Sequence, residues 1–140
     1  MEWSRTGLIE WNDAYSVNVA ALDEQHQTLI AQIREFQEAM MEGRAAQSIG
    51  QILSNLHAYT QFHFTFEEGL MEANAYPEMA AHQAVHVALA ERVGDFEHQL
   101  KARNMIPSTQ MIIFMRHWLT DHIIAVDRDL GAYLNLKGVR

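Results

Sequence analysis

Apolar residues recur at alternating steps of three and four along much of this chain, the spacing that gives an α-helix one apolar face. The clearest run, in which two histidines share the apolar stripe, is Met79, His82, His86, Leu89, Val93, Phe96 and Leu100. It predicts a helix from Pro77 to about Arg103, with Pro77 in the first turn, where proline is well tolerated. With only seven glycines and two prolines in 140 residues, the whole chain favours helix.

Three further segments have the same periodicity and predict three more helices. One runs from Asp23, a suitable N-cap, to about Glu42, where Gly43 supplies the stop. The next covers residues 45–73, and the last carries its inward positions within residues 111–130.

Short turns join these segments, which predicts an all-α fold, an up-down-up-down four-helix bundle. The bundle should form a single domain over residues 21–136, because a chain of 140 residues fits one core. Residues 1–20 should form an extended N-terminal arm, since apolar and polar side chains alternate from Tyr15 to Val19.

The composition excludes several classes of site and partner. There is no cysteine, which rules out disulfides, thiolate zinc sites and iron–sulfur clusters. A net charge of −8 disfavours binding to nucleic acid and to anionic membranes. No apolar run has the length of a transmembrane helix, and the residues from Met1 to Glu10 do not resemble a signal peptide. We therefore expect a cytoplasmic protein that is not bound to membranes, while a protein partner stays unknown.

Eight histidines are many for this length, and helical wheels sort them. Three lie away from the apolar stripes, so we expect His57, His98 and His117 to be surface or flank residues. The other five share the inward faces with two carboxylates, and all four helices contribute to this set: His26, His63, Glu67, His82, His86, His122 and Asp127.

On the fourth helix the wheel leaves one position at the margin. With His122 at zero and about 100° per residue, the apolar stripe spans roughly −40° to +120°. Asp127 then falls near +140°, roughly at the edge of the stripe, from which a carboxylate still reaches inward. The competing pair His117 and Asp121 falls near −140° and −100°, clearly outside.

Five imidazoles and two carboxylates inside a bundle predict a metal site, because without a cation each buried group would cost several kcal/mol. Seven ligands exceed the four that zinc takes, and calcium and magnesium require oxygen ligands. Two ions that share both carboxylates and a bridging oxygen fit the count. With three histidines on one ion and two on the other, one ion keeps an open position. Iron accepts this geometry, although spacing alone does not rank it above manganese or cobalt.

The order of these residues resembles the bacterial hemerythrins. The segments that carry the resemblance are Leu22-Asp23-Glu24-Gln25-His26, His63-Phe64-Thr65-Phe66-Glu67-Glu68, His82-Gln83-Ala84-Val85-His86, and Trp118-Leu119-Thr120-Asp121-His122-Ile123 followed by Asp127. The resemblance runs from about Trp11 to Leu130 and fills all seven ligand positions of the family. It implies two iron ions (Fe2+/Fe3+) with a bridging oxo or hydroxo group, with Glu67 and Asp127 as the carboxylate bridges. It also implies that His82, His86 and His122 hold the saturated iron, whereas His26 and His63 hold the open one.

These features predict reversible binding of dioxygen, or of nitric oxide, without catalysis. Ferritin-like di-iron enzymes use four carboxylates and Glu-x-x-His motifs, and no such motif lies on an inward stripe here. The alternatives are a di-iron oxidase or peroxidase, and an oxygen or iron sensor module. A carrier needs a dry pocket at the open position, because water promotes irreversible oxidation. The residues predicted to line that pocket are Leu29, Phe64, Trp118, Leu119 and Ile123.

Overall fold

The computed structural model describes residues 8–103, 113, 115, 117, 118 and 120–140. In chain order its elements are η1 (Asp13–Tyr15), α1 (Ala20–Met41), α2 (Ala46–Ala73), α3 (Met79–Arg103), η2 (Thr120–Asp127) and α5 (Arg128–Leu136). The predicted turn at residues 104–108, together with Met111, lies outside the described residues.

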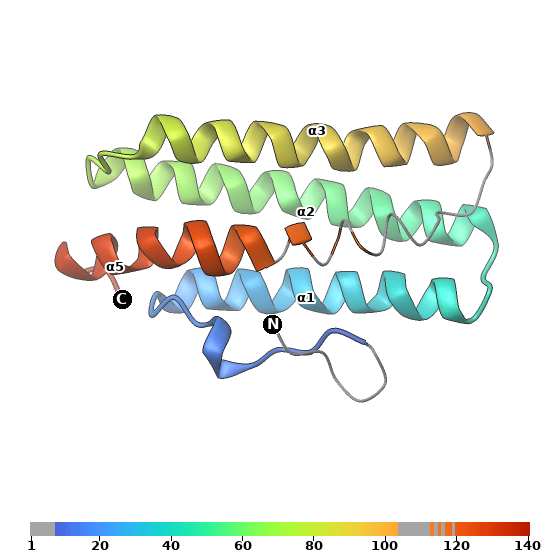
Figure 1. The fold of residues 1–140 in the computed structure, drawn as a ribbon, viewed down its shortest axis with the longest axis horizontal. Coiled ribbons are helices and arrows are strands. Elements are labelled where there is room, and N and C mark those ends of the chain that lie inside the picture. The colour runs from blue at the N-terminus through green and yellow to red at the C-terminus, as the bar shows by residue number, and fades with distance from the viewer. Residues whose placement is uncertain (1–7, 104–112, 114, 116, 119) are drawn as a thin grey trace.

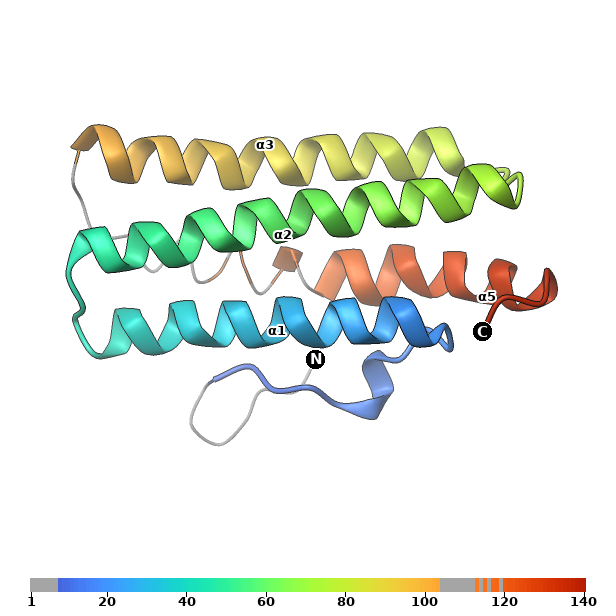
Figure 2. The ribbon, with the colours of Figure 1, turned by 180° about the vertical axis from the view of Figure 1, so that it is seen from behind.

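The helices lie side by side, and each runs in the opposite direction to the one before it (Figure 1). The view from behind shows α1, α2 and α3 as long helices whose axes are roughly aligned, with α5 at the fourth position of the bundle (Figure 2). Contacts join α1 to α2 and α2 to α3. The all-α, up-down-up-down bundle predicted from periodicity is therefore confirmed. No helix in the described part of the chain has the length and apolarity to cross a membrane.

The start of α1 differs from the prediction. The helix begins at Ala20, three residues before Asp23, and its N-cap is Val19, which makes no side-chain capping bond. Asp23 instead ties down the arm: its carboxylate accepts hydrogen bonds from Ser16 Oγ (2.5 Å) and from the backbone N–H of Val17 (2.8 Å). Asp23, which was predicted to cap α1, thus binds the segment of the arm that precedes the helix.

The turns lie at the predicted residues, but α3 begins two residues later than predicted. Gly43 adopts φ +67°, the left-handed conformation that ends α1. The break before α3 falls where predicted, with Ala75 at φ +52°. Pro77, however, lies in the turn and α3 begins at Met79, whose N–H donates to the Tyr76 carbonyl at 3.2 Å.

The arm packs along the bundle in an irregular conformation, and only part of it is extended. Tyr15, Val17 and Val19 are buried as their alternation predicts, but η1 interrupts the arm and Asn18 adopts φ +60°. Val17 lies against α5 at Gly131, where an added Cβ would stand 2.2 Å from the Val17 carbonyl oxygen. A glycine is therefore required where the arm crosses α5.

The fourth helical segment departs from the regular α-helix that the wheel assumed. Residues Thr120–Asp127 form a π-helix, η2, whose backbone hydrogen bonds join residues five apart. This wider turn brings residues five positions apart onto nearly the same face, and His122 and Asp127 have that separation. Asp127 is consequently fully buried, whereas the α-helical wheel had left it at the edge of the stripe.

Candidate metal centre

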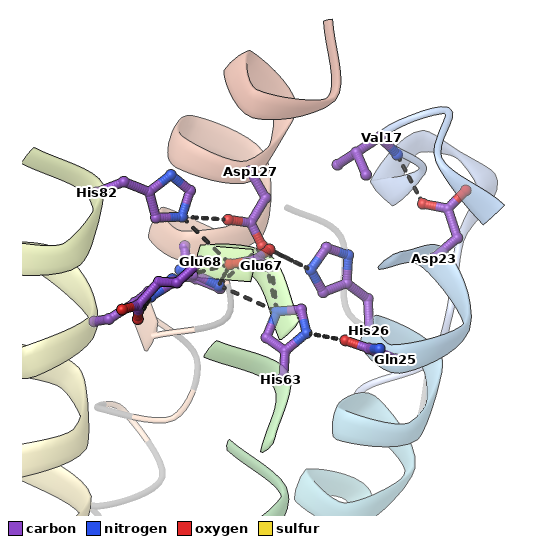
Figure 3. Close-up of polar contacts among 11 residues, drawn as sticks. Val17, Asp23, Gln25, His26, His63, Glu67, Glu68, His82 and Asp127 are labelled. Atoms are coloured by element: carbon purple, nitrogen blue, oxygen red, sulfur yellow. Dashed lines mark hydrogen bonds and ion pairs between the residues drawn. The ribbon is translucent and has the colours of Figure 1, made fainter. Parts of the chain in front are cut away.

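The seven side chains predicted as ligands converge at one place in the core. His26 comes from α1, His63 and Glu67 from α2, and His82 and His86 from α3, while η2 supplies His122 and Asp127. Each is at most 3% exposed. The close-up shows histidines of α1, α2 and α3 turned toward the two carboxylates (Figure 3). The sequence pattern thus identified a set that the fold does assemble.

The five imidazoles all direct Nε2 at a carboxylate oxygen. Three of these contacts reach Asp127: His26 Nε2 lies 2.7 Å from Oδ2, His122 Nε2 lies 2.9 Å from Oδ2, and His82 Nε2 lies 3.0 Å from Oδ1. The other two reach Glu67: His86 Nε2 lies 2.9 Å from Oε1, and His63 Nε2 lies 3.2 Å from Oε2. The two carboxylates therefore lie at the middle of the cluster, and the five histidines surround them.

The donor atoms form two overlapping groups, within each of which one ligand atom per residue lies within 4.8 Å of the others. Glu67, His122 and Asp127 belong to both groups. One group adds His26 and His63, and the other adds His82 and His86. This arrangement fits two neighbouring cations that share both carboxylates.

Hydrogen bonds at the far side of two rings direct their lone pairs inward. His63 Nδ1 donates to Gln25 Oε1 at 2.7 Å, and His86 Nδ1 donates to Glu68 Oε2 at 2.8 Å. In a neutral ring Nε2 is then an acceptor that faces a carboxylate oxygen, an arrangement in which both atoms can bind the same cation. The sequence analysis did not identify Gln25 and Glu68, because their partners belong to other helices; their adjacency to His26 and Glu67 was the only signal.

Several ligand atoms are buried and lie only in ion-pair contacts, without a hydrogen bond of good geometry among the described residues. They include Oε2 of Glu67, Oδ1 of Asp127 and Nε2 of His82. Buried polar atoms are costly unless they are paired, and metal coordination would satisfy all three. The residues present therefore fit a carboxylate-bridged pair of metal ions.

The two buried carboxylates favour positive charge on the groups around them. Burial lowers the pKa of His122 and His82, but Asp127 and Glu67 outweigh it and raise these pKa values to about 10 and about 9. Burial raises the pKa of Glu67, but the imidazoles of His63 and His122 hold it well below its usual value. Burial and Glu67 raise the pKa of Asp127, and His122 lowers it overall. Both carboxylates are therefore anionic and require cations beside them.

Aromatic rings cover one side of the centre. Phe64 stacks on His86, with centroids 3.9 Å apart and planes 8° apart, and lies edge-on to His122 at 5.1 Å. Trp118 lies 5.8 Å from His122 and 6.2 Å from Phe64. Leu29 is fully buried on α1, one turn after His26. Leu119 lies outside the described residues, and so does the side chain of Ile123.

The remaining histidines lie outside the centre, as the wheels predicted. His98 and His117 are exposed. His57 is on the flank of α2 with its side chain 23% exposed, and its Nδ1 donates to Glu97 Oε1 at 3.0 Å. Glu97 also accepts a hydrogen bond from Ser54 Oγ at 2.5 Å, so His57 belongs to a polar contact between α2 and α3.

Comparisons with known proteins agree with this geometry. Residues 17–134 match the family described as Hemerythrin HHE cation binding domain. The bacteriohemerythrin of Stenotrophomonas maltophilia is 31% identical over 91% of this chain and 85% of its own length. That of Methylococcus capsulatus is 30% identical over 91% of this chain and 98% of its own. A solved structure described as wild-type hemerythrin superposes with a TM-score of 0.84 at 30% identity, covering 91% of this chain and 98% of its own.

Proposed function

The chain belongs to the hemerythrin family, and from its centre we propose that it binds two iron ions and, through them, dioxygen in a reversible manner. The observation that carries the proposal is the convergence of five Nε2 atoms on two shared, buried carboxylates. Iron accepts both imidazole and carboxylate ligands.

We assign the ligands from the family pattern together with the two donor groups. Glu67 and Asp127 would bridge the ions, since both occur in each group. His26 and His63 would hold one iron, and His82 and His86 would hold the other. His122 belongs to both groups, so its assignment to the iron of His82 and His86 rests on the family pattern alone. The iron pair, when bound, supplies the electrons that dioxygen takes up on binding and returns on release.

The protein's own residues exclude water and fix the rings. Gln25 and Glu68 hold the rings of His63 and His86 with Nε2 turned inward, which keeps these ligands pre-oriented. Phe64 and Trp118 cover His86 and His122 with apolar surface, and Leu29 is buried one turn after His26. Leu119 and Ile123 remain predicted members of this wall. A dry wall slows the loss of reduced oxygen species, which would leave the iron oxidised, and so favours reversible binding.

The donor set supports binding over catalysis. Five neutral imidazoles against two carboxylates leave more net positive charge on the metal pair than the four-carboxylate set of ferritin-like enzymes. That charge stabilises the ferrous state and works against strongly oxidising chemistry.

The experiment that tests the proposal is optical and needs no substrate. The reduced, iron-loaded protein is exposed to dioxygen, then deoxygenated, then aired again. We expect visible absorption that appears, disappears and returns over several cycles, with two irons per chain by metal analysis. Oxygen consumed over repeated cycles without a reversible spectrum would identify an oxidase or peroxidase, and one ion per chain would contradict the di-iron centre.

A matched pair of core substitutions tests the dry wall. Leu29→Asn should hasten irreversible oxidation of the iron. Leu53→Asn is the control, because Leu53 is equally buried but lies ten residues before His63, about 15 Å along α2. Equal oxidation rates in the two variants would show that Leu29 acts only through general stability.

A further inference from the structure

A pocket of about 210 Å³ lies against the centre on its His82 side. Its walls include Tyr76, Glu78, Ala81, His82, Ala125 and Asp129, so it lies among the turn before α3, α3 itself, η2 and α5. Glu78, Ala125 and Asp129 are exposed, whereas His82 is only 3% exposed. The pocket therefore runs from a surface that bears two carboxylates to a buried ligand of the centre.

His82 has two different edges at this boundary. Its Nε2 lies 3.0 Å from Asp127 Oδ1 and 3.3 Å from Glu67 Oε1. Its Nδ1 is buried without a hydrogen-bond partner among the described residues. Figure 3 shows the Nε2 edge turned to the carboxylates and the Nδ1 edge turned away from them. The imidazole of His82 thus lies between the pocket and the two carboxylates, and no hydrogen bond from the described residues holds its outer edge.

Negative charge continues from the pocket to the centre. Tyr76 lies in the pocket wall with its ring 6.3 Å from that of His82. The exposed carboxylates of Glu78 and Asp129 line this pocket, and the buried carboxylate of Asp127 lies 3.0 Å from His82 Nε2 on the inner side of the ring. Carboxylates therefore lie on both sides of the His82 imidazole.

We propose that this pocket is the uptake site through which hydrated ferrous iron reaches the centre, with Glu78 and Asp129 attracting the ion and His82 admitting it. Carboxylates are suitable ligands for a hydrated divalent cation, and an acidic cleft raises its local concentration and association rate. The inference rests on the proposed iron centre and adds to it a route and two residues outside the ligand set.

A second pocket, of about 330 Å³, reaches the centre at His86 and is the competing route. Its carboxylate, Glu68, already accepts hydrogen bonds from His86 Nδ1 and from Gln83 Nε2 at 3.1 Å. Phe64 stacks on His86 and covers that ring with apolar surface. Among the described residues of the pocket at His82, no carboxylate is tied to a ligand ring in this way and no aromatic ring stacks on His82. The structure therefore favours this pocket as the route.

The test measures iron transfer in both directions with the intact protein. Glu78→Gln combined with Asp129→Asn removes the rim charges. Glu91→Gln combined with Asp95→Asn is the matched control, because both residues are exposed on α3, about 14 to 20 Å beyond His82 along the helix. Anaerobic release of Fe2+ from the loaded protein to excess ferrous chelator is followed by absorbance, and reloading with Fe2+ is followed by metal analysis against time.

We expect the rim variant to load and release iron at least about fivefold more slowly than wild type at low ionic strength, with the deficit shrinking in high salt. Both variants should still bind two irons, and the control should keep wild-type rates. Ala125→Trp, which fills the mouth without altering charge, should slow both directions in the same way.

Three results would overturn the inference. One is a rim variant with the rates of the control, and another is normal transfer in Ala125→Trp. The third is slow transfer in Glu68→Gln alone, which would assign the route to the pocket at His86. In each case the protein still binds two irons, whereas a chain that binds no iron pair would contradict the proposed function itself.

Discussion

His122 Nε2 and Asp127 Oδ2 lie 2.9 Å apart, although the two residues are five positions apart in the chain. In an α-helix this separation turns the second side chain about 140° away from the first. The π-helical turn of Thr120–Asp127 holds more residues per turn, which reduces that difference and lets both side chains reach the same point. One helix thereby supplies both an imidazole and a carboxylate to the centre.

Replacement of His122 tests this geometry directly. His122→Ala should lower the iron content well below two per chain, because it removes a donor common to both groups. His117→Ala is the control: His117 lies in the same helical segment but is exposed. Metal analysis of the purified variants gives the answer, and loss of iron in the His117 variant with retention in the His122 variant would contradict the structure.

Removal of the iron should destabilise the fold, because the core then retains buried carboxylates and imidazoles without a cation. A metal present at a thousand times its dissociation constant stabilises a protein by about 4 kcal/mol. For a chain of this size that corresponds to a fall in Tm of about 10 °C or more. Calorimetry of the loaded and the chelated protein measures the shift, and equal melting temperatures would refute a metal-dependent core.

The carboxylate behind His86 should affect metal affinity without being a ligand. Glu68→Ala removes the acceptor of His86 Nδ1 and should weaken metal binding about 10- to 100-fold. Glu68→Gln keeps a carbonyl oxygen there and should recover part of the loss. Competition with a chelator of known affinity measures both variants. Glu72→Ala, an exposed site on the same helix, should bind metal as the wild type does.

Two glycines in helices should respond oppositely to alanine. Gly131→Ala places a Cβ 2.2 Å from the Val17 carbonyl oxygen and should reduce the free energy of unfolding by about 1–3 kcal/mol. Gly69→Ala meets nothing within 4 Å and should raise it by up to about 1 kcal/mol, since alanine favours helix. Urea unfolding of the iron-loaded variants compares them. A neutral Gly131 variant would mean that the arm moves away from α5 at no cost.

The Glu97 cluster should make a pH-dependent contribution to stability. Burial raises the pKa of Glu97, but hydrogen bonds from Ser54 and His57 outweigh it and hold that pKa below its usual value. A group of this kind stabilises the fold above its unfolded pKa of about 4.3, and the contribution is lost as the pH falls through the lower folded value. Wild type should therefore exceed Glu97→Gln in free energy of unfolding at pH 7, by less than about 1 kcal/mol, and the difference should shrink as the pH falls below about 4. A difference that grew on acidification would have the wrong sign.

Local patterns in the sequence were sufficient for the helices and for the set of polar side chains that meet in the core. Periodicity placed α2 and the end of α3 within a residue or two, because each helix must bury one continuous apolar face. The same rule assembled the ligand set, because five histidines and two carboxylates on inward faces have no stable alternative to a cation. The left-handed conformation of Gly43 was also predictable, since glycine adopts it at little cost.

Features that depend on contacts between distant segments required the tertiary structure. Asp23 serves the arm and does not cap α1, because Ser16 and Val17 fold back onto it. Gln25 and Glu68 acquire their roles from histidines 38 and 18 residues away, on other helices. No local pattern in the sequence predicts the π-helical turn at His122 and Asp127. Such turns are rare and occur mostly at functional sites, and here the turn places His122 Nε2 and Asp127 Oδ2 2.9 Å apart in the centre.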